Sequence, residues 1–223
     1  MVLLKKIAAK LPHQWQTGLK RIFFNRQIRK GAFESDEPEY QILDNFIKSG
    51  DWVLDIGANV GHYTKRFSEL VGKRGRVIAF EPVPTTFSLL SANIQLFNYP
   101  NVTLLNAAVS DKLDVVGMSM PKFDSGLSNY YMAHISAPAD SELSVLTLSI
   151  DALNINQQIS LVKIDAEGHE AFVVSGMKKL IEKYHPVLII ETAEQEFIDS
   201  ITSLGYVSER LIDSPNTLFK PAV

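Results

Sequence analysis

The densest group of chemically able side chains lies in the segment VKIDAEGHE, which carries Asp165, Glu167 and His169 directly after a short apolar run. A second apolar run ends in Glu191. Ligands of open α/β sheets lie in the crevice at the carboxyl ends of the strands. We therefore expect these four side chains to form one catalytic site. The alternative is that the acids cap the helix that follows, a role that suits Glu170 in particular.

A glycine-containing turn in VLDIGANVGHYT is suited to binding a ligand through its backbone. The pattern predicts a strand that ends at Asp55, a turn through Gly57 and Asn59, and a helix from about Gly61. Such a turn lets backbone amides and the helix N-terminus face a ligand, because glycine has no side chain to block its approach. The segment does not match GxGxxG, the pattern of dinucleotide-binding turns, because Asn59 replaces its second glycine. This difference disfavours a dinucleotide as the ligand.

An acidic residue, Glu81, ends the next apolar run, 24 positions after Gly57. A carboxylate there can accept hydrogen bonds from both hydroxyls of a ribose. The alternative is an acid at a helix N-cap before Pro84, but the glycine turn favours the ribose. A third run ends at Asn106 and Ala107, where an adenine would lie; Asn106 either pairs with the base or caps a turn.

From residue 39 the hydrophobic pattern alternates between strand-like and helical segments. Strands joined by crossover helices form a parallel sheet with helices on both faces. The predicted strands cover 52–56, 76–80, 102–106, 161–164 and 187–190, with a terminal pair at 206–212 and 217–219. The predicted helices cover 40–47, 61–71, 84–97 and 170–184.

The segment 115–150 breaks this alternation. It contains short alternating stretches separated by many serines, by Gly126 and by Pro138. We expect extra strands and a long loop, inserted between the third and fourth strands of the sheet. Long insertions in compact domains are commonly lids or binding loops, so we assign acceptor selection to this segment.

The composition limits the kinds of site and the classes of protein that remain possible. A chain of 223 residues that is 46% hydrophobic has enough apolar residues for one core. The absence of cysteine excludes disulfides, thiolate zinc sites and cysteine nucleophiles. The apolar runs are too short to span a bilayer, and the N-terminus lacks a secretory pattern, so we expect a cytoplasmic protein.

The net charge of −3 conceals a basic N-terminal arm on an acidic body. Residues 1–30 hold eight basic side chains and no acid, whereas residues 31–223 hold 14 basic and 25 acidic side chains. Apolar residues recur along the arm at Leu3, Ile7, Leu11, Trp15, Leu19, Ile22 and Phe23, which predicts two amphipathic helices interrupted at Pro12. This stripe either packs on the domain as a lid, the interpretation we favour, or contacts an anionic membrane or glycolipid.

The segments DIGANVGHYT, FEPVP, NVTLLNAAVSD, LVKIDAEGHE and PVLIIET occur in the order that resembles the FkbM family of S-adenosylmethionine-dependent O-methyltransferases. The resemblance covers roughly residues 37–212 and leaves out the arm, so we divide the chain into an arm, 1–36, and a methyltransferase domain, 37–223. It implies the Rossmann-like methyltransferase fold, an α/β fold with a mostly parallel seven-stranded sheet, helices on both faces and an antiparallel last strand. It also implies methyl transfer to a hydroxyl of a sugar, glycolipid or secondary metabolite.

The resemblance assigns S-adenosyl-L-methionine as cofactor and Asp165, Glu167 and Glu191 as strand-end carboxylates. Either a general base, Asp165 or His169, activates the hydroxyl, or a divalent cation does; we favour the metal-free route. The partner is then a small-molecule or glycan acceptor and no nucleic acid. The alternatives are an NAD(P)-dependent oxidoreductase and a cofactor-free, membrane-associated binding module. The residues predicted to bind the cofactor are Asp55, Gly57, Ala58, Asn59, Gly61, Tyr63, Glu81, Asn106 and Ala107.

Overall fold

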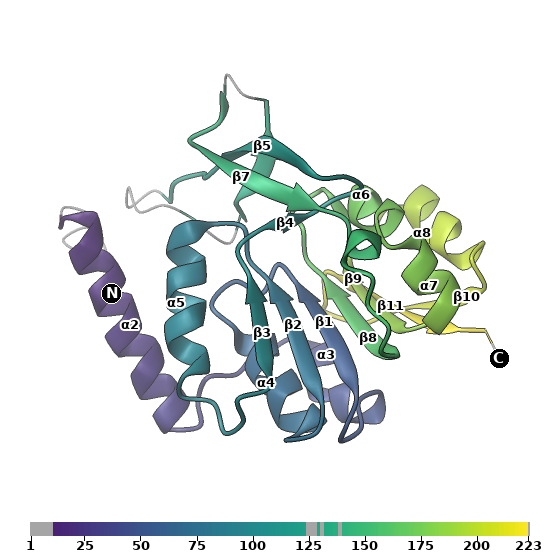
Figure 1. The fold of residues 1–223 in the computed structure, drawn as a ribbon, viewed down its shortest axis with the longest axis horizontal. Coiled ribbons are helices and arrows are strands. Elements are labelled where there is room, and N and C mark those ends of the chain that lie inside the picture. Colours follow the sequence, from purple (N-terminus) through teal and green to yellow (C-terminus); the bar gives the residue numbers. More distant parts are fainter. Residues whose placement is uncertain (1–10, 124–128, 130–131, 138–139, 223) are drawn as a thin grey trace.

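A seven-stranded sheet lies at the centre of the computed structural model, which describes residues 11–123, 129, 132–137 and 140–222 (Figure 1). Its strand order is β10-β11-β9-β8-β1-β2-β3. Neighbouring strands are parallel, except that β11 runs antiparallel to β9 and β10. This is the predicted fold class. The strands are β1 (Trp52–Ile56), β2 (Arg76–Phe80), β3 (Val102–Leu105), β8 (Ile159–Ile164), β9 (Val187–Glu191), β10 (Tyr206–Arg210) and β11 (Asn216–Pro221).

Helices cover both faces of this sheet, so its central strands are apolar at nearly every position. Successive side chains of β1 enter different cores: Leu54 packs with the helices after β8 and β9, and Val53 packs with Phe67 of the helix after β1. The helices are α3 (Pro38–Gln41), α4 (His62–Val71), α5 (Pro84–Ile94), α6 (Glu170–Ser175), α7 (Lys178–Tyr184) and α8 (Gln195–Thr202).

Three predicted helices are shorter in the structure. The helix predicted at 84–97 ends at Ile94. The segment 40–47 forms only the end of α3 and a 3₁₀ turn, Leu43–Asn45. The segment 170–184 is divided into α6 and α7 at Gly176, where a Cβ atom would overlap the carbonyl oxygen of Ser110. The carboxylate of Asp151 then caps α7, because it accepts the backbone N–H groups of Lys179 and Leu180.

The inserted segment forms a second, four-stranded sheet above the carboxyl ends of the main strands (Figure 1). Its order is β4-β7-β5-β6, so the prediction of extra strands in this segment is confirmed. Its inner face packs on Val83 through a cluster that includes Ala108, Met118, Ala133 and Val145. The predicted loop residues Gly126 and Pro138 lie outside the described residues. The strands are β4 (Ala108–Val109), β5 (Asp114–Ser119), β6 (His134–Ser136) and β7 (Leu143–Leu148); a 3₁₀ turn, Ile150–Leu153, leads back to β8.

The arm contributes α2 (His13–Arg29), which lies along α5 (Figure 1). Phe24 and Ile28 are its buried side chains, in a cluster with Phe33, Val60 and Leu89. The arm therefore packs on the domain, as we favoured, but through the face that carries Phe24 and Ile28. The prediction that the apolar stripe makes the contact is wrong for its exposed members, Trp15, Leu19, Ile22 and Phe23. The stripe residues Leu3 and Ile7 lie outside the described residues. Of the helices in the described part of the chain, none is long and apolar enough to cross a membrane.

Candidate functional site

Two cavities meet at the carboxyl ends of β1, β2, β8 and β9, and four residues line both: Glu37, Gly57, Asn59 and Asp165. The first cavity lies beneath the second sheet and adds residues from β1, β2, β4, β5, β6 and β9 and from the turn after β8. The second cavity lies between the glycine turn and the segment before α3, and it adds Glu34, Ser35, Asp55, Ala58, His62, Tyr63 and Lys163. The sequence did not indicate that the segment at Glu37 joins the site, because no local pattern links it to the strands.

The glycine turn has a structural reason beyond ligand approach. Gly57 has a φ of +80°, and a Cβ atom there would overlap the carbonyl oxygen of Asp165 at the end of β8. Gly61, with a φ of +99°, is the N-cap of α4, and its Cβ would lie 2.6 Å from Leu90 Cδ1. Gly61 lines neither cavity. Gly57 thus holds β1 close to β8, while Gly61 holds α4 close to α5.

Glu81, predicted to bind ribose, lines the first cavity at the end of β2 and is 5% exposed. Its carboxylate accepts the backbone N–H of Val83 at 2.8 Å and that of Asn59 at 2.9 Å. Burial raises the pKa of Glu81 to about 8, although both backbone N–H groups oppose the shift. Ala107 lines the same cavity, whereas Asn106 does not: its amide donates to the carbonyls of residues 81 and 82, which corresponds to the turn-capping alternative.

Asp55, at the end of β1, is fully buried. Its Oδ2 accepts the Thr64 hydroxyl at 2.5 Å, while its Oδ1 has no hydrogen-bond partner. Asn59 Oδ1 is likewise buried without a partner. Burial raises the pKa of Asp55 to about 6, while Lys163 lowers it. Unpartnered buried oxygens are costly, and here both belong to residues that line the second cavity.

Lys163, which was missed in the sequence, is the buried cation of the site. Its Nζ lies 2.8 Å from Asp165 Oδ2 and 4.6 Å from the centroid of the Tyr63 ring. The Tyr63 hydroxyl in turn lies 2.7 Å from Glu37 Oε2. Although burial lowers the pKa of Lys163, the carboxylates of Asp165 and Asp55 raise it above its ordinary value. A lone lysine within the apolar run of β8 was the signal that could have found it.

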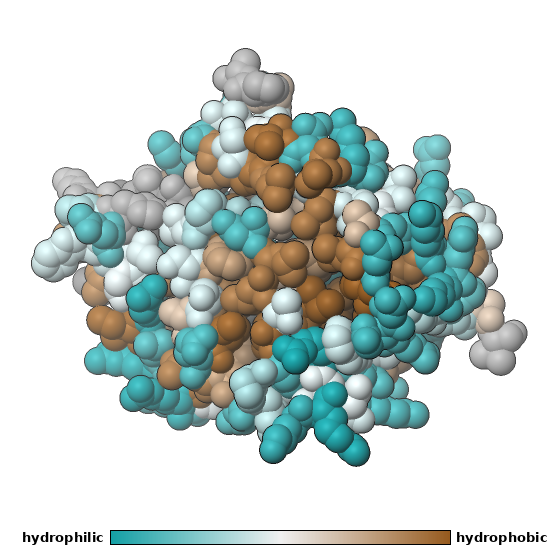
Figure 2. Space-filling view, in the orientation of Figure 1, coloured by the Kyte–Doolittle hydropathy of each residue, from teal (hydrophilic) through white to brown (hydrophobic). Residues whose placement is uncertain are grey.

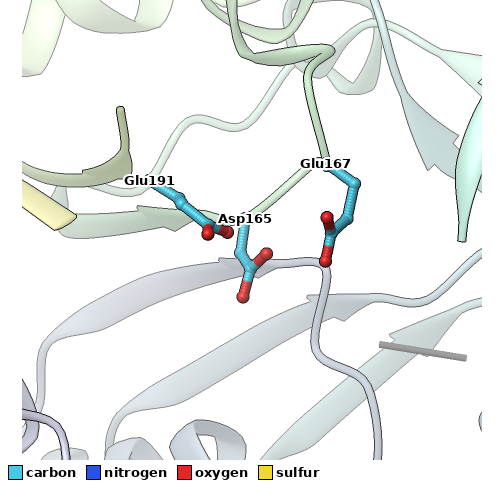
Figure 3. Close-up of side chains that lie close together, drawn as sticks. All are labelled: Asp165, Glu167 and Glu191. Atoms are coloured by element: carbon cyan, nitrogen blue, oxygen red, sulfur yellow. The ribbon is translucent and has the colours of Figure 1, made fainter. Parts of the chain in front are cut away.

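Three carboxylates, Asp165, Glu167 and Glu191, come together in the first cavity, as Figure 3 shows. One oxygen from each lies within 4.8 Å of the others. Although burial opposes it, Lys163 holds the pKa of Asp165 below its usual value. Burial and a hydrogen bond with Asp165 raise the pKa of Glu191 to about 8. The pair therefore shares one proton near neutral pH, with Glu191 as the donor.

Glu167 lies on a turn of unusual backbone conformation. Its φ is +50° and that of Gly168 is +92°. A non-glycine residue in this region is strained, and such strain gathers at functional sites. Burial and the charge of Asp165 raise the pKa of Glu167 to about 7. Glu167 is thus a carboxylate that exchanges its proton near neutral pH.

His169 lines the first cavity, but its ring already has partners. Its Nε2 lies 2.8 Å from Ser110 Oγ, and the ring stacks on Phe172 with the centroids 4.5 Å apart. Burial lowers the pKa of His169. Glu170 lines neither cavity; its Oε1 accepts the backbone N–H groups of residues 166 and 168, as the capping alternative predicts.

Known proteins resemble this chain in sequence and fold. Hexuronic acid methyltransferase AglP of Haloferax volcanii is 25% identical over 142 residues, which cover 62% of this chain and 55% of that protein. Protein-L-isoaspartate O-methyltransferase 1 of Archaeoglobus fulgidus is 32% identical over 65 residues, or 29% of each chain. The crystal structure of methyltransferase FkbM from Methylobacillus flagellatus superposes with a TM-score of 0.56 at 17% identity, over 77% of this chain and 43% of that one. The chain thus spans between 29% and 55% of the length of these proteins.

The profile of the methyltransferase FkbM domain matches residues 55–208, from the glycine turn to the terminal strand pair. The matched range contains the glycine turn, the acid after β2 and the three clustered carboxylates. This family match favours a methyltransferase over the two alternatives, a nicotinamide-dependent oxidoreductase and a cofactor-free binding module. The chain therefore belongs to the FkbM methyltransferase family.

Proposed function

We propose that the protein methylates a hydroxyl oxygen of a sugar, a glycolipid or a secondary metabolite. The observation that carries this proposal is the cluster of Asp165, Glu167 and Glu191 beside the glycine turn, because a hydroxyl must lose a proton when it attacks a methyl group. Carboxylates also accept hydrogen bonds from the several hydroxyls of a sugar. The similarity to hexuronic acid methyltransferase AglP supports the choice of a sugar.

The cavities fit S-adenosyl-L-methionine, which supplies an electrophilic methyl group on a sulfonium when bound. We assign the ribose to Glu81 in the first cavity and the amino-acid end to the second cavity. There Asp55 Oδ1 and Asn59 Oδ1 lack partners and are able to accept N–H groups. Lys163 is the cation that would face a carboxylate. The surrounding acids favour a cofactor with a net positive charge.

Glu167 is the residue that we assign to accept the hydroxyl proton. A pKa of about 7 matches a general base that works at neutral pH. This replaces our expectation of Asp165 or His169 in that role. Asp165 already forms an ion pair with Lys163 and a hydrogen bond with Glu191, and the His169 ring is hydrogen-bonded to Ser110. Asp165 and Glu191 then orient the acceptor.

We assign acceptor selection to the second sheet and the residue before β6, since Met118, Ala133 and Ile135 line the first cavity together with the carboxylates. An acceptor with phosphates close to its reactive hydroxyl would be repelled by the ionised Glu167 that the reaction requires, so we propose no nucleic-acid substrate. The direct test is a screen of sugars, glycolipids and hydroxylated metabolites with labelled methyl donor. An oxygen-methylated product identified by mass spectrometry supports the proposal, whereas methylation only at carbon or at a carboxyl contradicts it.

Turnover is expected to survive removal of divalent cations. The three carboxylates resemble a metal site, but Lys163 already neutralises Asp165, and the raised pKa of Glu191 keeps its proton on near neutral pH. Carboxylate ligands of Mg²⁺ bind it through ionised oxygens, so this cluster is a weak magnesium site. The measurement is turnover of the identified acceptor after EDTA treatment. Activity that vanishes and returns with Mg²⁺ would establish the metal route instead.

Glu81→Ala is expected to weaken cofactor affinity about 10- to 150-fold, which corresponds to about 1.5 to 3 kcal/mol for a hydrogen bond to a charged group. The affinity for S-adenosylhomocysteine is measured by calorimetry. Glu209→Ala is a matched control, because this glutamate pairs with Lys220 on the surface. Unchanged affinity of a Glu81→Ala protein that melts like wild type would remove Glu81 from the site.

A further inference from the structure

Helix α2 carries apolar side chains on two opposite faces. One face, with Phe24 and Ile28, is buried against the domain. On the other face Trp15, Leu19, Ile22 and Phe23 are 66%, 51%, 52% and 56% exposed. Their spacing of four, three and one residues places them on one side of a helix. We call these four residues the exposed ridge; Figure 2 shows brown side chains at the left margin, over α2.

Basic side chains follow the exposed ridge on the same face of α2. Arg26, Arg29 and Lys30 are exposed, and their spacing from Trp15, Leu19 and Ile22 places them on the same face, one to four turns further along. The chain has no acidic residue before Glu34. Single exposed apolar residues are ordinary, but four on one helix face next to three cations indicate an interaction surface.

We propose that this face of α2 docks on an anionic phospholipid bilayer. Interfacial helices bury an apolar ridge, often with Trp and Phe, at the boundary of headgroups and acyl chains, while Lys and Arg contact anionic headgroups. Charge complementarity selects this partner. A second exposed apolar group, Leu113, Val115 and Leu146, lies on and beside β5 and β7. The one cation next to it in the sequence, Lys112, is paired with Asp114 at 2.9 Å, and Asp111 adds a further negative charge.

The placement of α2 determines which part of the domain would face the bilayer. The first turn of α2 lies at the end of the main sheet where the strands finish and the second sheet begins (Figure 1). Docking through Trp15 would therefore hold the first cavity near the headgroup layer. The docking itself rests on the exposed ridge and its cations alone, so it does not depend on the identity of the methyl acceptor.

The test is co-sedimentation of the full chain with vesicles of phosphatidylcholine alone or with about 30% phosphatidylglycerol. We expect binding only to the anionic vesicles, weakened at about 0.5 M salt, where charges are screened. The variant Arg26→Gln/Arg29→Gln/Lys30→Gln should lose about fivefold in partitioning per charge, on the order of a hundredfold in total. The variant Leu19→Gln/Phe23→Gln removes two of the four apolar side chains of the exposed ridge and should lose at least tenfold in partitioning. The control is Val207→Gln/Ile212→Gln, which removes two exposed apolar residues elsewhere.

Trp15 provides a second readout. In a Trp52→Phe background it is the remaining tryptophan, and its emission should shift to the blue with anionic vesicles only. Three results would overturn the proposal: equal partitioning of the ridge variant and the control, equal binding to neutral vesicles, or a wild-type dimer in sedimentation that Leu19→Gln/Phe23→Gln converts to a monomer. The last result would assign the ridge to a second copy of the chain.

Discussion

Glu167→Gln is expected to lower kcat by roughly 100- to 10,000-fold, the contribution that a positioned general base makes. Glutamine keeps the size of the side chain and one hydrogen-bond acceptor, but it cannot take a proton at neutral pH. The affinity for S-adenosylhomocysteine should change far less than kcat, because ribose and amino-acid contacts are assigned to other residues. Glu194→Gln is the matched control, an exposed glutamate in the loop after β9.

The pH profile of kcat distinguishes the candidate bases. The pKa of Glu167 is raised to about 7, so the active carboxylate form is lost as the pH falls through that value. We expect kcat to fall about tenfold per pH unit below 7 in the wild type and this limb to disappear in Glu167→Gln. If Asp165 were the base, the limb would lie at acidic pH, because Lys163 holds the pKa of Asp165 below its ordinary value.

Retention of activity by Glu167→Gln would contradict the assignment. A kcat within fivefold of wild type, together with a large loss in Asp165→Asn, would return the base to Asp165. A large loss in His169→Gln would instead assign it to the imidazole that lies beside Ser110. The melting temperature of each variant separates these outcomes from misfolding.

The parallel strands could be predicted from the sequence because both of their faces are buried, which makes each strand a short apolar run. The predicted runs at 52–56 and 76–80 coincide with β1 and β2. The break between α6 and α7 could not be predicted, since it depends on the backbone of Ser110, which is distant in sequence. The apolar residues of α2 lie on two faces of the helix, and either face could pack on the domain. The position of α5 determines which of them is buried, and this position is not evident in the sequence.

The strand-end acids could also be predicted, because the carboxyl ends of parallel strands meet at one edge of a sheet. The pKa values of these acids could not be predicted from the sequence. The pKa values of Glu167 and Glu191 are raised by burial and by the charge of Asp165, which depend on the folded arrangement. Lys163 was visible as a charge in an apolar run, but its ion pair with Asp165 became evident only in the structure.

Gly57→Ala is expected to weaken cofactor binding and to destabilise the fold. A non-glycine residue at a φ of +80° costs about 1 to 2 kcal/mol, and the overlap of the new Cβ with the carbonyl oxygen of Asp165 adds about 1 to 3 kcal/mol. Gly205→Ala separates the two contributions, because Gly205 has a φ of +89° and nothing within 4 Å of an added Cβ. Denaturant unfolding and calorimetry with S-adenosylhomocysteine measure both effects.

The same comparison tests why Gly57 is a glycine. If a side chain there only obstructed the cofactor, Gly57→Ala would unfold like Gly205→Ala and lose affinity alone. The structure instead places the added Cβ against the backbone of Asp165, so β1 and β8 must separate and the carboxylate cluster must move. We therefore expect Gly57→Ala to be less stable than Gly205→Ala and, at saturating cofactor, to keep a lowered kcat. Equal stability of the two variants would contradict this account of the turn.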